Sequence, residues 1–268
     1  EVCGGDGQIL TSPVDYFLVR FDDQTEYRQA ETMRTDFVAN ASHELRTPLA
    51  SLSGFIETLQ GPARDDREAH VKFLGIMQDQ ADRMSRLVDD LLSLSRIEMK
   101  AHRQPTSPVD ITEVVSHMVD AMTPLASEAK VKLSVTMPDQ TPTILGDRDE
   151  LVQVFDNLVD NAIKYGQSGE RVEIEIAFED DEDELYPLSV NIRDFGPGIA
   201  PEHLQRLTER FYRVDVEQSR QQKGTGLGLA IVKHILARHK GRLDIVSEID
   251  HGAIFSARFT QASIFKGQ

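Results

Sequence analysis

The sequence predicts a multidomain chain in which a long helical hairpin precedes an α/β sandwich. Apolar residues recur at helical spacing through two long segments between residues 25 and 103. A proline-containing segment follows at 104–108, and helical and alternating patterns then take turns to the C-terminus. The length of 268 residues is enough for two domains. We therefore expect the hairpin over 25–103, a linker over 104–108 and the α/β domain over 109–268.

The two predicted helices carry apolar seams that indicate pairing. In the first, apolar positions are spaced by three or four residues until Gly61-Pro62 ends the helix; in the second, the two spacings alternate strictly. Further leucines widen the second seam beyond what one hairpin can bury. Two hairpins that pair into a four-helix bundle would cover it, so we expect a homodimer. The seam positions are Val38, Ala41, Leu45, Leu49, Leu52, Ile56 and Leu59, then Leu74, Met77, Ala81, Met84, Val88 and Leu91, and the further leucines are Leu87, Leu92 and Leu94.

The segment after residue 108 predicts a mixed sheet that is covered by helices on one face. Asp147, with Glu150 in the capping-box position, predicts the start of a helix that runs to Tyr165. The acidic run Glu179–Glu184 predicts a solvated turn, because a run of neighbouring carboxylates does not converge on one metal ion. Other helices are expected over 111–128, after Pro201 and over 226–239, and strands over 131–137, 171–179, 185–194, 242–248 and 253–260.

Residues 1–24 are expected to be the end of an upstream module or a linker. Val14–Phe21 has the pattern of a strand, and Asp22–Glu26 follows it. Together they resemble the exit of a PAS-type sensor domain, where a last strand and an Asp-x-Thr turn lead into a signalling helix. A separate N-terminal strand explains the same residues equally well.

Composition and charge restrict the partners of the chain. The net charge of −16 argues against non-specific nucleic-acid binding, which needs a basic surface. Cys3 is the single cysteine and cannot form an internal disulfide, which fits a reducing compartment. No apolar run reaches the roughly 18 residues of a membrane span. A simple cytosolic protein fits these features, but the chain begins abruptly, so we expect the cytoplasmic part of a longer receptor that is anchored in the inner membrane.

His43 lies in the segment Ala41–Leu49, at the start of the first helical pattern. At about 100° per residue its side chain points away from the apolar seam, so we expect it to face solvent. Glu44 lies beside it, and Thr47 lies one turn later on the same face. An exposed imidazole is a suitable nucleophile for a phosphoryl group, and a neighbouring carboxylate can hold its second ring N–H.

Polar and glycine residues typical of a phosphate or nucleotide site follow in the second half of the chain. Asn157 and Asn161 are four residues apart on one helix face, although an ordinary polar surface explains such a pair when it stands alone. Lys164 lies one turn after Asn161 and can reach phosphate oxygens. Tyr165 can pack on a nucleotide.

Two glycine motifs complete this group. Asp194 ends a strand, and Gly196 and Gly198 after it let the backbone approach a ligand closely. Gly224-Thr-Gly226-Leu-Gly228 opens a helix whose free N–H groups favour phosphate. It is not a Walker motif because no Gly-Lys-Ser/Thr follows, and no strand leads directly into it as a dinucleotide fold requires. The polar stretch Val214–Lys223 predicts a mobile lid, with Phe211 and Tyr212 at its root.

The order of these motifs resembles that of the bacterial sensor histidine kinases over roughly residues 25–262. Their ATP domain is similar to those of gyrase, Hsp90 and MutL, and the run Asp36–Glu44 is most similar to the phosphate-regulon sensor kinases. The resemblance implies that ATP phosphorylates His43 and that the phosphoryl group passes to an aspartate of a response regulator. It also implies that Thr47 orients a water for dephosphorylation of that regulator, which makes His43, Glu44 and Thr47 the expected catalytic residues.

For the nucleotide site the resemblance implies ATP with Mg²⁺, and it makes Asn161 the metal ligand. Asp194 would accept a hydrogen bond from the adenine amine. Arg213 would contact the γ-phosphate, an ordinary surface ion pair being the alternative for this arginine. The expected nucleotide-binding residues are Asn157, Asn161, Lys164, Tyr165, Asp194, Gly196, Gly198, Ile199, Arg213, Gly224, Thr225, Gly226, Leu227, Gly228 and Leu229.

Two other classes of protein remain open. A regulatory scaffold would bind ATP and a partner without phosphorylating itself, which the presence of Glu44, Asn161 and Asp194 disfavours. A gyrase- or chaperone-type ATPase would share the nucleotide motifs, but the helical hairpin upstream disfavours it.

Overall fold

The computed structural model describes residues 2–3, 9–10, 25–100, 103–178, 185–214, 224–261 and 263–264. In the helix that begins at Thr25, side chains are described from Phe37 onward. The chain forms two compact units, Glu1–Ser42 and His43–Gln268. The predicted strand at 14–21, the acidic turn at 179–184 and all of the predicted lid except Val214 lie outside the described residues. None of the described helices is long and apolar enough to cross a membrane.

The first unit contains a short antiparallel pair of strands, β1 (Val2–Cys3) and β2 (Ile9–Leu10). Helix α1 (Thr25–Gln60) begins in this unit and continues into the second. Its first residue agrees with the sequence pattern, which turns helical at Thr25.

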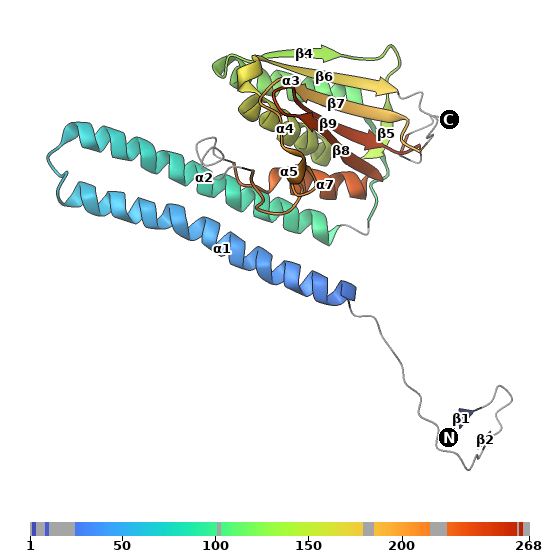
Figure 1. Cartoon of the computed structure of the whole chain (residues 1–268), viewed down its shortest axis with the longest axis horizontal. Coiled ribbons are helices and arrows are strands. Elements are labelled where there is room, and N and C mark those ends of the chain that lie inside the picture. Colours follow the sequence, from blue (N-terminus) through green and yellow to red (C-terminus); the bar gives the residue numbers. More distant parts are fainter. Residues whose placement is uncertain are drawn as a thin grey trace. The chain divides into compact units, whose positions relative to one another are not determined.

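Helix α1 and helix α2 (Arg67–Met99) form the predicted hairpin (Figure 1). The turn between them contains Gly61-Pro62, as expected, and the side chain of Asp66 begins α2 by accepting a hydrogen bond from the Ala69 N–H at 2.9 Å. The rings of Phe55 and Phe73 pack across the hairpin with centroids 5.2 Å apart.

The hairpin leaves part of its apolar seam exposed. Leu74 on α2 is 55% exposed and Val88 is 41% exposed, and Leu92 beside the seam is half exposed. Leu87 and Leu94, by contrast, are buried within one chain, in which α2 also packs on helix α7 (Gly228–Arg238) of the α/β domain. The prediction that these two leucines need a second hairpin to cover them was therefore wrong, whereas Leu74, Val88 and Leu92 are only partly covered by the described residues of the single chain.

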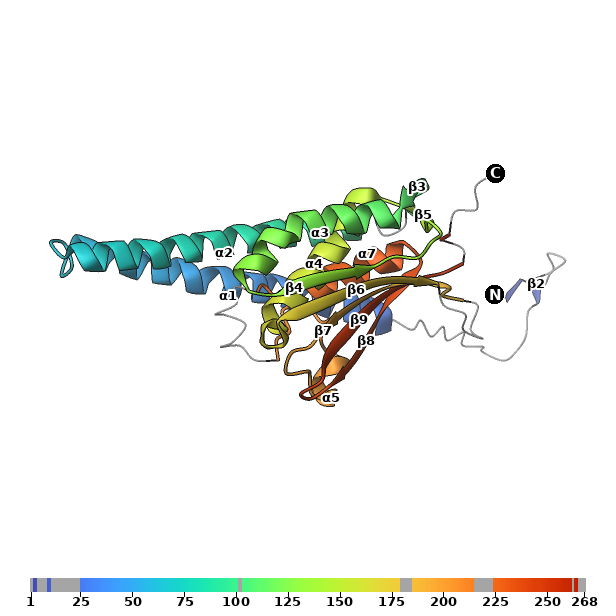
Figure 2. The same ribbon diagram turned by 90° about the horizontal axis from the view of Figure 1, so that it is seen from above.

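The α/β domain contains a five-stranded mixed sheet in the order β4-β6-β7-β9-β8. The edge strand β4 is parallel to β6, and all other pairs are antiparallel. Helices α3, α4 and α7 lie on one face of this sheet (Figure 2), which confirms the predicted architecture. The strands are β4 (Lys132–Thr136), β6 (Arg171–Phe178), β7 (Leu188–Asp194), β8 (Gly241–Glu248) and β9 (Gly252–Phe259).

The long helices of this domain begin at aspartate caps. Helix α3 (Ile111–Glu128) begins after Asp110, and α4 (Arg148–Tyr165) begins after Asp147 and ends at Tyr165 as predicted. Asp147 caps the Glu150 N–H, but the Glu150 carboxylate pairs with Arg238 instead of completing a capping box. The short helices are α5 (Pro201–Leu204) and the 3₁₀ turn η1 (Gln167–Gly169).

A second, two-stranded antiparallel sheet was not predicted. It pairs β3 (Ser107–Asp110) with β5 (Thr143–Gly146), so the predicted linker at 104–108 ends inside a strand. The pattern was missed because each strand has only four residues and β3 begins with a proline-containing turn sequence. The antiparallel pairing places the start of α3 beside the beginning of β5, where the Ile111 N–H donates to the Pro142 carbonyl at 3.0 Å.

Candidate active site

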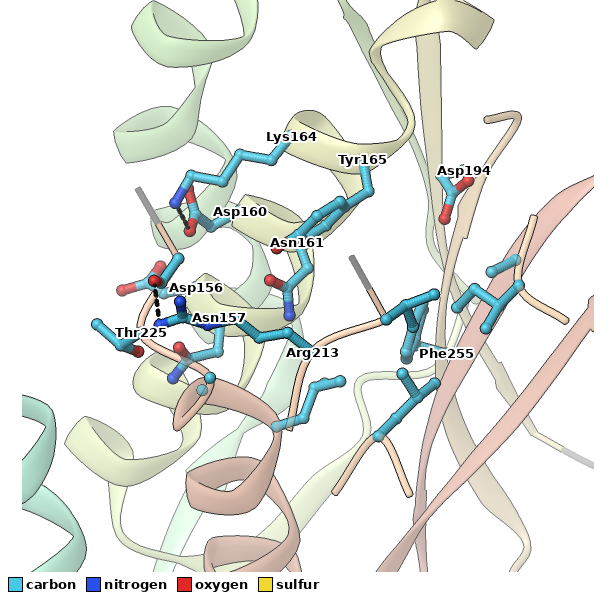
Figure 3. Close-up of a pocket in the computed structure, with 18 of the residues that line it drawn as sticks. Asp156, Asn157, Asp160, Asn161, Lys164, Tyr165, Asp194, Arg213, Thr225 and Phe255 are labelled. Carbon is cyan, nitrogen blue, oxygen red and sulfur yellow. Dashed lines mark hydrogen bonds and ion pairs between the residues drawn. The ribbon is translucent and has the colours of Figure 1, made fainter. Parts of the chain in front are cut away.

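A cavity of about 690 Å³ lies between α2, α4, the segment after β7 and the start of α7 (Figure 3). It gathers most of the residues that the nucleotide motifs predicted. Gly196 and Leu227 do not line it: Gly196 packs against the Tyr165 carbonyl, and Leu227 is fully buried in the core. The predicted residues that line the cavity are Asn157, Asn161, Lys164, Tyr165, Asp194, Gly198, Ile199, Arg213, Gly224, Thr225, Gly226, Gly228 and Leu229.

Helix α4 supplies the amide pair. Its buried face packs into the core, and Asn157 and Asn161 lie on the opposite side, toward the cavity. The Asn157 Nδ2 donates to the Gln153 carbonyl at 2.8 Å, which leaves its oxygen toward α7. A Cβ at Gly228 would lie 2.7 Å from that oxygen, so this glycine allows α7 to approach α4. Lys164 extends to an ion pair with Asp160 on the same helix.

Asp194 ends β7 at the other side of the cavity, only 5% exposed. Its Oδ1 accepts a hydrogen bond from the Gly196 N–H at 2.9 Å. Burial raises the pKa of this carboxyl, and the hydrogen bonds from the Gly196 and Ala253 N–H groups offset only part of that effect. Gly198 has φ +71°, and a Cβ there would lie 2.0 Å from the Glu248 carbonyl oxygen, so only glycine fits this turn.

The loop from Gly224 to Gly228 leads into α7 with its backbone close to the cavity. Gly226 has φ +75°, and its carbonyl accepts a hydrogen bond from the Phe211 N–H at 2.8 Å. The loop is therefore tied to the root of the predicted lid. In the described part of the chain no side chain caps the first turn of α7, so its N–H groups are open to an anion.

Arg213 connects this loop to the first helix of the hairpin. Its Nη2 donates to the Gly224 carbonyl at 2.8 Å and to Glu44 Oε2 at 3.1 Å, and only 7% of the side chain is exposed. Its Nε is buried with no hydrogen-bond partner among the described residues. An exposed surface ion pair, the alternative for this arginine, therefore does not describe it.

The residues around His43 are arranged partly as predicted. His43 is exposed, which confirms that it faces solvent, and the Thr47 hydroxyl donates to the His43 carbonyl at 3.3 Å. The Glu44 carboxylate differs from the expectation, because it accepts hydrogen bonds from Arg83 of α2 at 2.8 Å and from Arg213. Adjacent residues on a helix point about 100° apart, and this turn directs Glu44 toward the two arginines.

Four charged residues of the cavity were not predicted. Arg86 and Asp90 come from α2, and Asp156 and Asp160 come from α4. The Thr225 hydroxyl donates to Asp90 Oδ2 at 2.6 Å, which joins the glycine loop to α2. Asp156 and Asp160 could have been predicted from the sequence, because each directly precedes one of the two asparagines on the same helix. Nothing in the sequence could pair Asp90 with a loop so far along the chain.

The balance of charge in the cavity bears on its ligand. Its lining contains more carboxylates than cations: Asp90, Asp156, Asp160 and Asp194 against Arg86, Lys164 and Arg213. Burial raises the pKa of Asp90 and of Asp156. Within the described ranges no group of three or more His, Cys, Asp or Glu side chains could hold a metal ion by itself.

Comparisons with known proteins agree with this geometry. Residues 33–100 match the family model for the His Kinase A (phospho-acceptor) domain, and residues 146–263 match that for the histidine kinase-, DNA gyrase B- and HSP90-like ATPase. The chain is 40% identical over 253 residues to the phosphate regulon sensor protein PhoR of Pseudomonas aeruginosa, an alignment that covers 94% of this chain and 55% of PhoR.

Two solved structures share the fold. The histidine kinase AdeS of Acinetobacter baumannii has a TM-score of 0.61 and 28% identity, over 81% of this chain and 97% of AdeS. Full-length ShkA in complex with AMPPNP has a TM-score of 0.61 and 26% identity, over 89% of this chain and 47% of ShkA. The chain spans about half the length of its relative PhoR. With a phosphoacceptor domain followed by an ATPase-type domain, the chain belongs to the sensor histidine kinases, and PhoR is one of the relatives that it resembles.

Proposed function

We propose that this chain phosphorylates itself on His43 with ATP, passes the phosphoryl group to an aspartate of a response regulator, and also dephosphorylates that regulator. The observation that carries the proposal is the link through Arg213, which joins the cavity of the nucleotide motifs to the residue beside His43. Residues 25–103 would act as the dimerisation and phosphotransfer part and residues 109–268 as the catalytic part.

ATP is the ligand that the cavity suits best. Its volume of about 690 Å³ is in the range of small-molecule and cofactor sites. Asp194 offers a buried acceptor for an amine at one side, and the open N–H groups of α7 lie at another. Arg213 adds a buried Nε without a partner among the described residues, as expected of a group that binds an anion. The complex of the relative ShkA with AMPPNP supports the same ligand.

Mg²⁺ would enter with the nucleotide. The excess of carboxylates in the cavity disfavours a free polyphosphate, and a divalent cation offsets that charge. No described cluster of acidic or histidine side chains could hold the ion alone, which fits an ion that keeps waters and bridges phosphates. Asn161 lies on the cavity face of α4 and would supply one amide oxygen.

The proposed reaction makes one bond and breaks one. An imidazole nitrogen of His43 attacks the γ-phosphorus, the N–P bond forms and the bond from phosphorus to the ADP oxygen breaks. The exposure of His43 allows this attack and the later approach of a regulator. Arg213 would neutralise charge on the transferred group, and Glu44 would hold the second ring N–H of the imidazole.

The proposed assembly is a homodimer that docks a response regulator and has no nucleic-acid partner. Exposed apolar residues along α2, Leu74 and Val88 among them, support pairing of two hairpins. By likeness to PhoR, a longer protein, we propose that the chain is the cytoplasmic portion of a receptor in the inner membrane.

Incubation with γ-labelled ATP and Mg²⁺ tests the proposal against its rivals. If the chain is a kinase, the protein itself should carry a label that is labile in acid and stable in base. Release of free phosphate without a labelled protein would indicate an ATPase. Nucleotide binding with neither product would indicate a scaffold.

A further inference from the structure

Asp90 lines the cavity although it belongs to none of the three nucleotide motifs. It projects from α2, and its Oδ2 accepts a hydrogen bond from the Thr225 hydroxyl, with the two oxygens 2.6 Å apart. The same Thr225 oxygen accepts a hydrogen bond from the Leu227 N–H at 3.3 Å. The carboxylate is therefore fixed beside the loop whose N–H groups are expected to bind phosphate.

The surroundings of Asp90 make its charge effective there. Arg86 lies one turn earlier on α2 and also lines the cavity, and Lys164 approaches from α4. Both cations act favourably on the Asp90 carboxylate, while burial disfavours its charged form and raises its pKa. A partly buried charge is screened less by salt than an exposed one. Asp90 thus offsets part of the positive charge of Arg86 and Lys164, and Lys164 is also paired with Asp160.

We propose that Asp90 sets the nucleotide affinity of this kinase, as a negative charge held at the phosphate side of the cavity by Thr225. The carboxylate repels the nucleotide's phosphates and competes with them for Arg86 and Lys164. Helix α2 thereby weakens nucleotide binding while it is docked on the ATPase-type domain. The inference rests on the proposed function, because it needs the cavity to bind a nucleotide.

The test is calorimetric titration of the full chain with Mg·ATP, for wild type and Asp90→Asn. The variant keeps an acceptor for Thr225 and removes the charge, so affinity should rise about three- to ten-fold. Asp89→Asn is the matched control, since Asp89 is exposed on the same helix and does not line the cavity. It should stay within about two-fold of wild type. Thermal unfolding of each variant checks that the fold is intact.

A double-mutant cycle tests the anchoring by Thr225. In a Thr225→Val background Asp90 is no longer held, so Asp90→Asn should change affinity much less than in wild type. Thr225→Ser keeps the hydroxyl and should restore the full effect.

The outcomes separate the inference from the proposed function. Absence of Mg·ATP binding by wild type would overturn the proposed function. Binding by wild type with unchanged or weaker binding by Asp90→Asn would overturn the inference alone. An equal effect of Asp90→Asn in the wild-type and Thr225→Val backgrounds would overturn the anchoring by Thr225.

Discussion

The guanidinium of Arg213 lies 3.1 Å from the carboxylate of Glu44, the residue that follows His43. The same carboxylate accepts a hydrogen bond from Arg83 at 2.8 Å. Glu44 is therefore held by two cations, one from α2 and one from the ATPase-type domain. Both arginines bind Oε2, which leaves Oε1 as the oxygen to hold the imidazole of His43 during transfer.

Glu44→Gln tests this role. The amide is close to the carboxylate in shape but carries no charge to stabilise an imidazole that bonds to phosphorus. Autophosphorylation should fall about a hundred-fold or more, while Mg·ATP affinity changes by no more than a few-fold. Initial rates of labelling with γ-labelled ATP give the first quantity and calorimetry the second. Glu57→Gln, an exposed glutamate of α1, is the control. A Glu44→Gln rate within two-fold of wild type would remove Glu44 from the mechanism.

Asp194→Asn should weaken the selection of adenine over guanine. In the variant an amide replaces the buried carboxylate that would accept a hydrogen bond from the adenine amine. A mismatched buried hydrogen bond lowers affinity about ten-fold or more. Competition of ATP and GTP against a fluorescent nucleotide measures the ratio, with Asp139→Asn, on an exposed turn, as control. Burial raises the pKa of Asp194, so this carboxylate takes up a proton at a higher pH than an exposed aspartate does. As the pH falls, ATP binding should therefore begin to weaken at a higher pH than it would with an exposed aspartate at this position. Unchanged selectivity in the variant would place the base elsewhere.

The chain should be a dimer through α1 and α2. Light scattering at micromolar concentration should give twice the chain mass of 30.1 kDa. Leu74→Glu places a charge in the exposed seam and should shift the chain toward the monomer, whereas Gly75→Glu, at an exposed position about 100° round the helix from Leu74, should not. A monomer mass for the unaltered chain would contradict the prediction.

Thr47→Ala should separate two activities. The hydroxyl lies one turn from His43, where it can position a water for attack on a regulator's aspartyl phosphate, but it is not the nucleophile. Decay of purified phospho-regulator with ADP and Mg²⁺ should slow strongly, and autophosphorylation should stay within a few-fold. Thr58→Ala is a matched control, since its hydroxyl makes the same bond to a carbonyl four residues earlier, Gly54, at 2.8 Å. Equal decay by wild type and Thr47→Ala would make Thr47 an ordinary surface residue.

The elements of the fold were largely predictable because their patterns are local. The periodicity of α3 and α4 and the turn at Gly61-Pro62 follow from residues close in sequence. The pairing of β3 with β5 was missed because it joins two four-residue strands across a helix. The burial of Leu87 and Leu94 within one chain was misjudged because the sequence does not show that α2 packs on α7, a helix far along the chain.

The candidate site was likewise predictable only where its residues lie close together in the sequence. The two asparagines, Asp194 and the glycine loop lie in motifs of a few residues, and the structure brings them to one cavity. The partners of Glu44 and the contribution of Asp90 depend on how α2 meets the ATPase-type domain. Such contacts arise from tertiary packing, so they could not be predicted from the spacing of residues in the sequence.

Labelling of His43→Gln with γ-labelled ATP tests the central claim most directly. His43 is proposed as the sole phosphoacceptor, so the variant should bind Mg·ATP like wild type and incorporate no acid-labile label. His70→Gln, on α2 of the same hairpin, should label like wild type. An acid-labile label on His43→Gln at the wild-type level, carried by another histidine, would contradict the account.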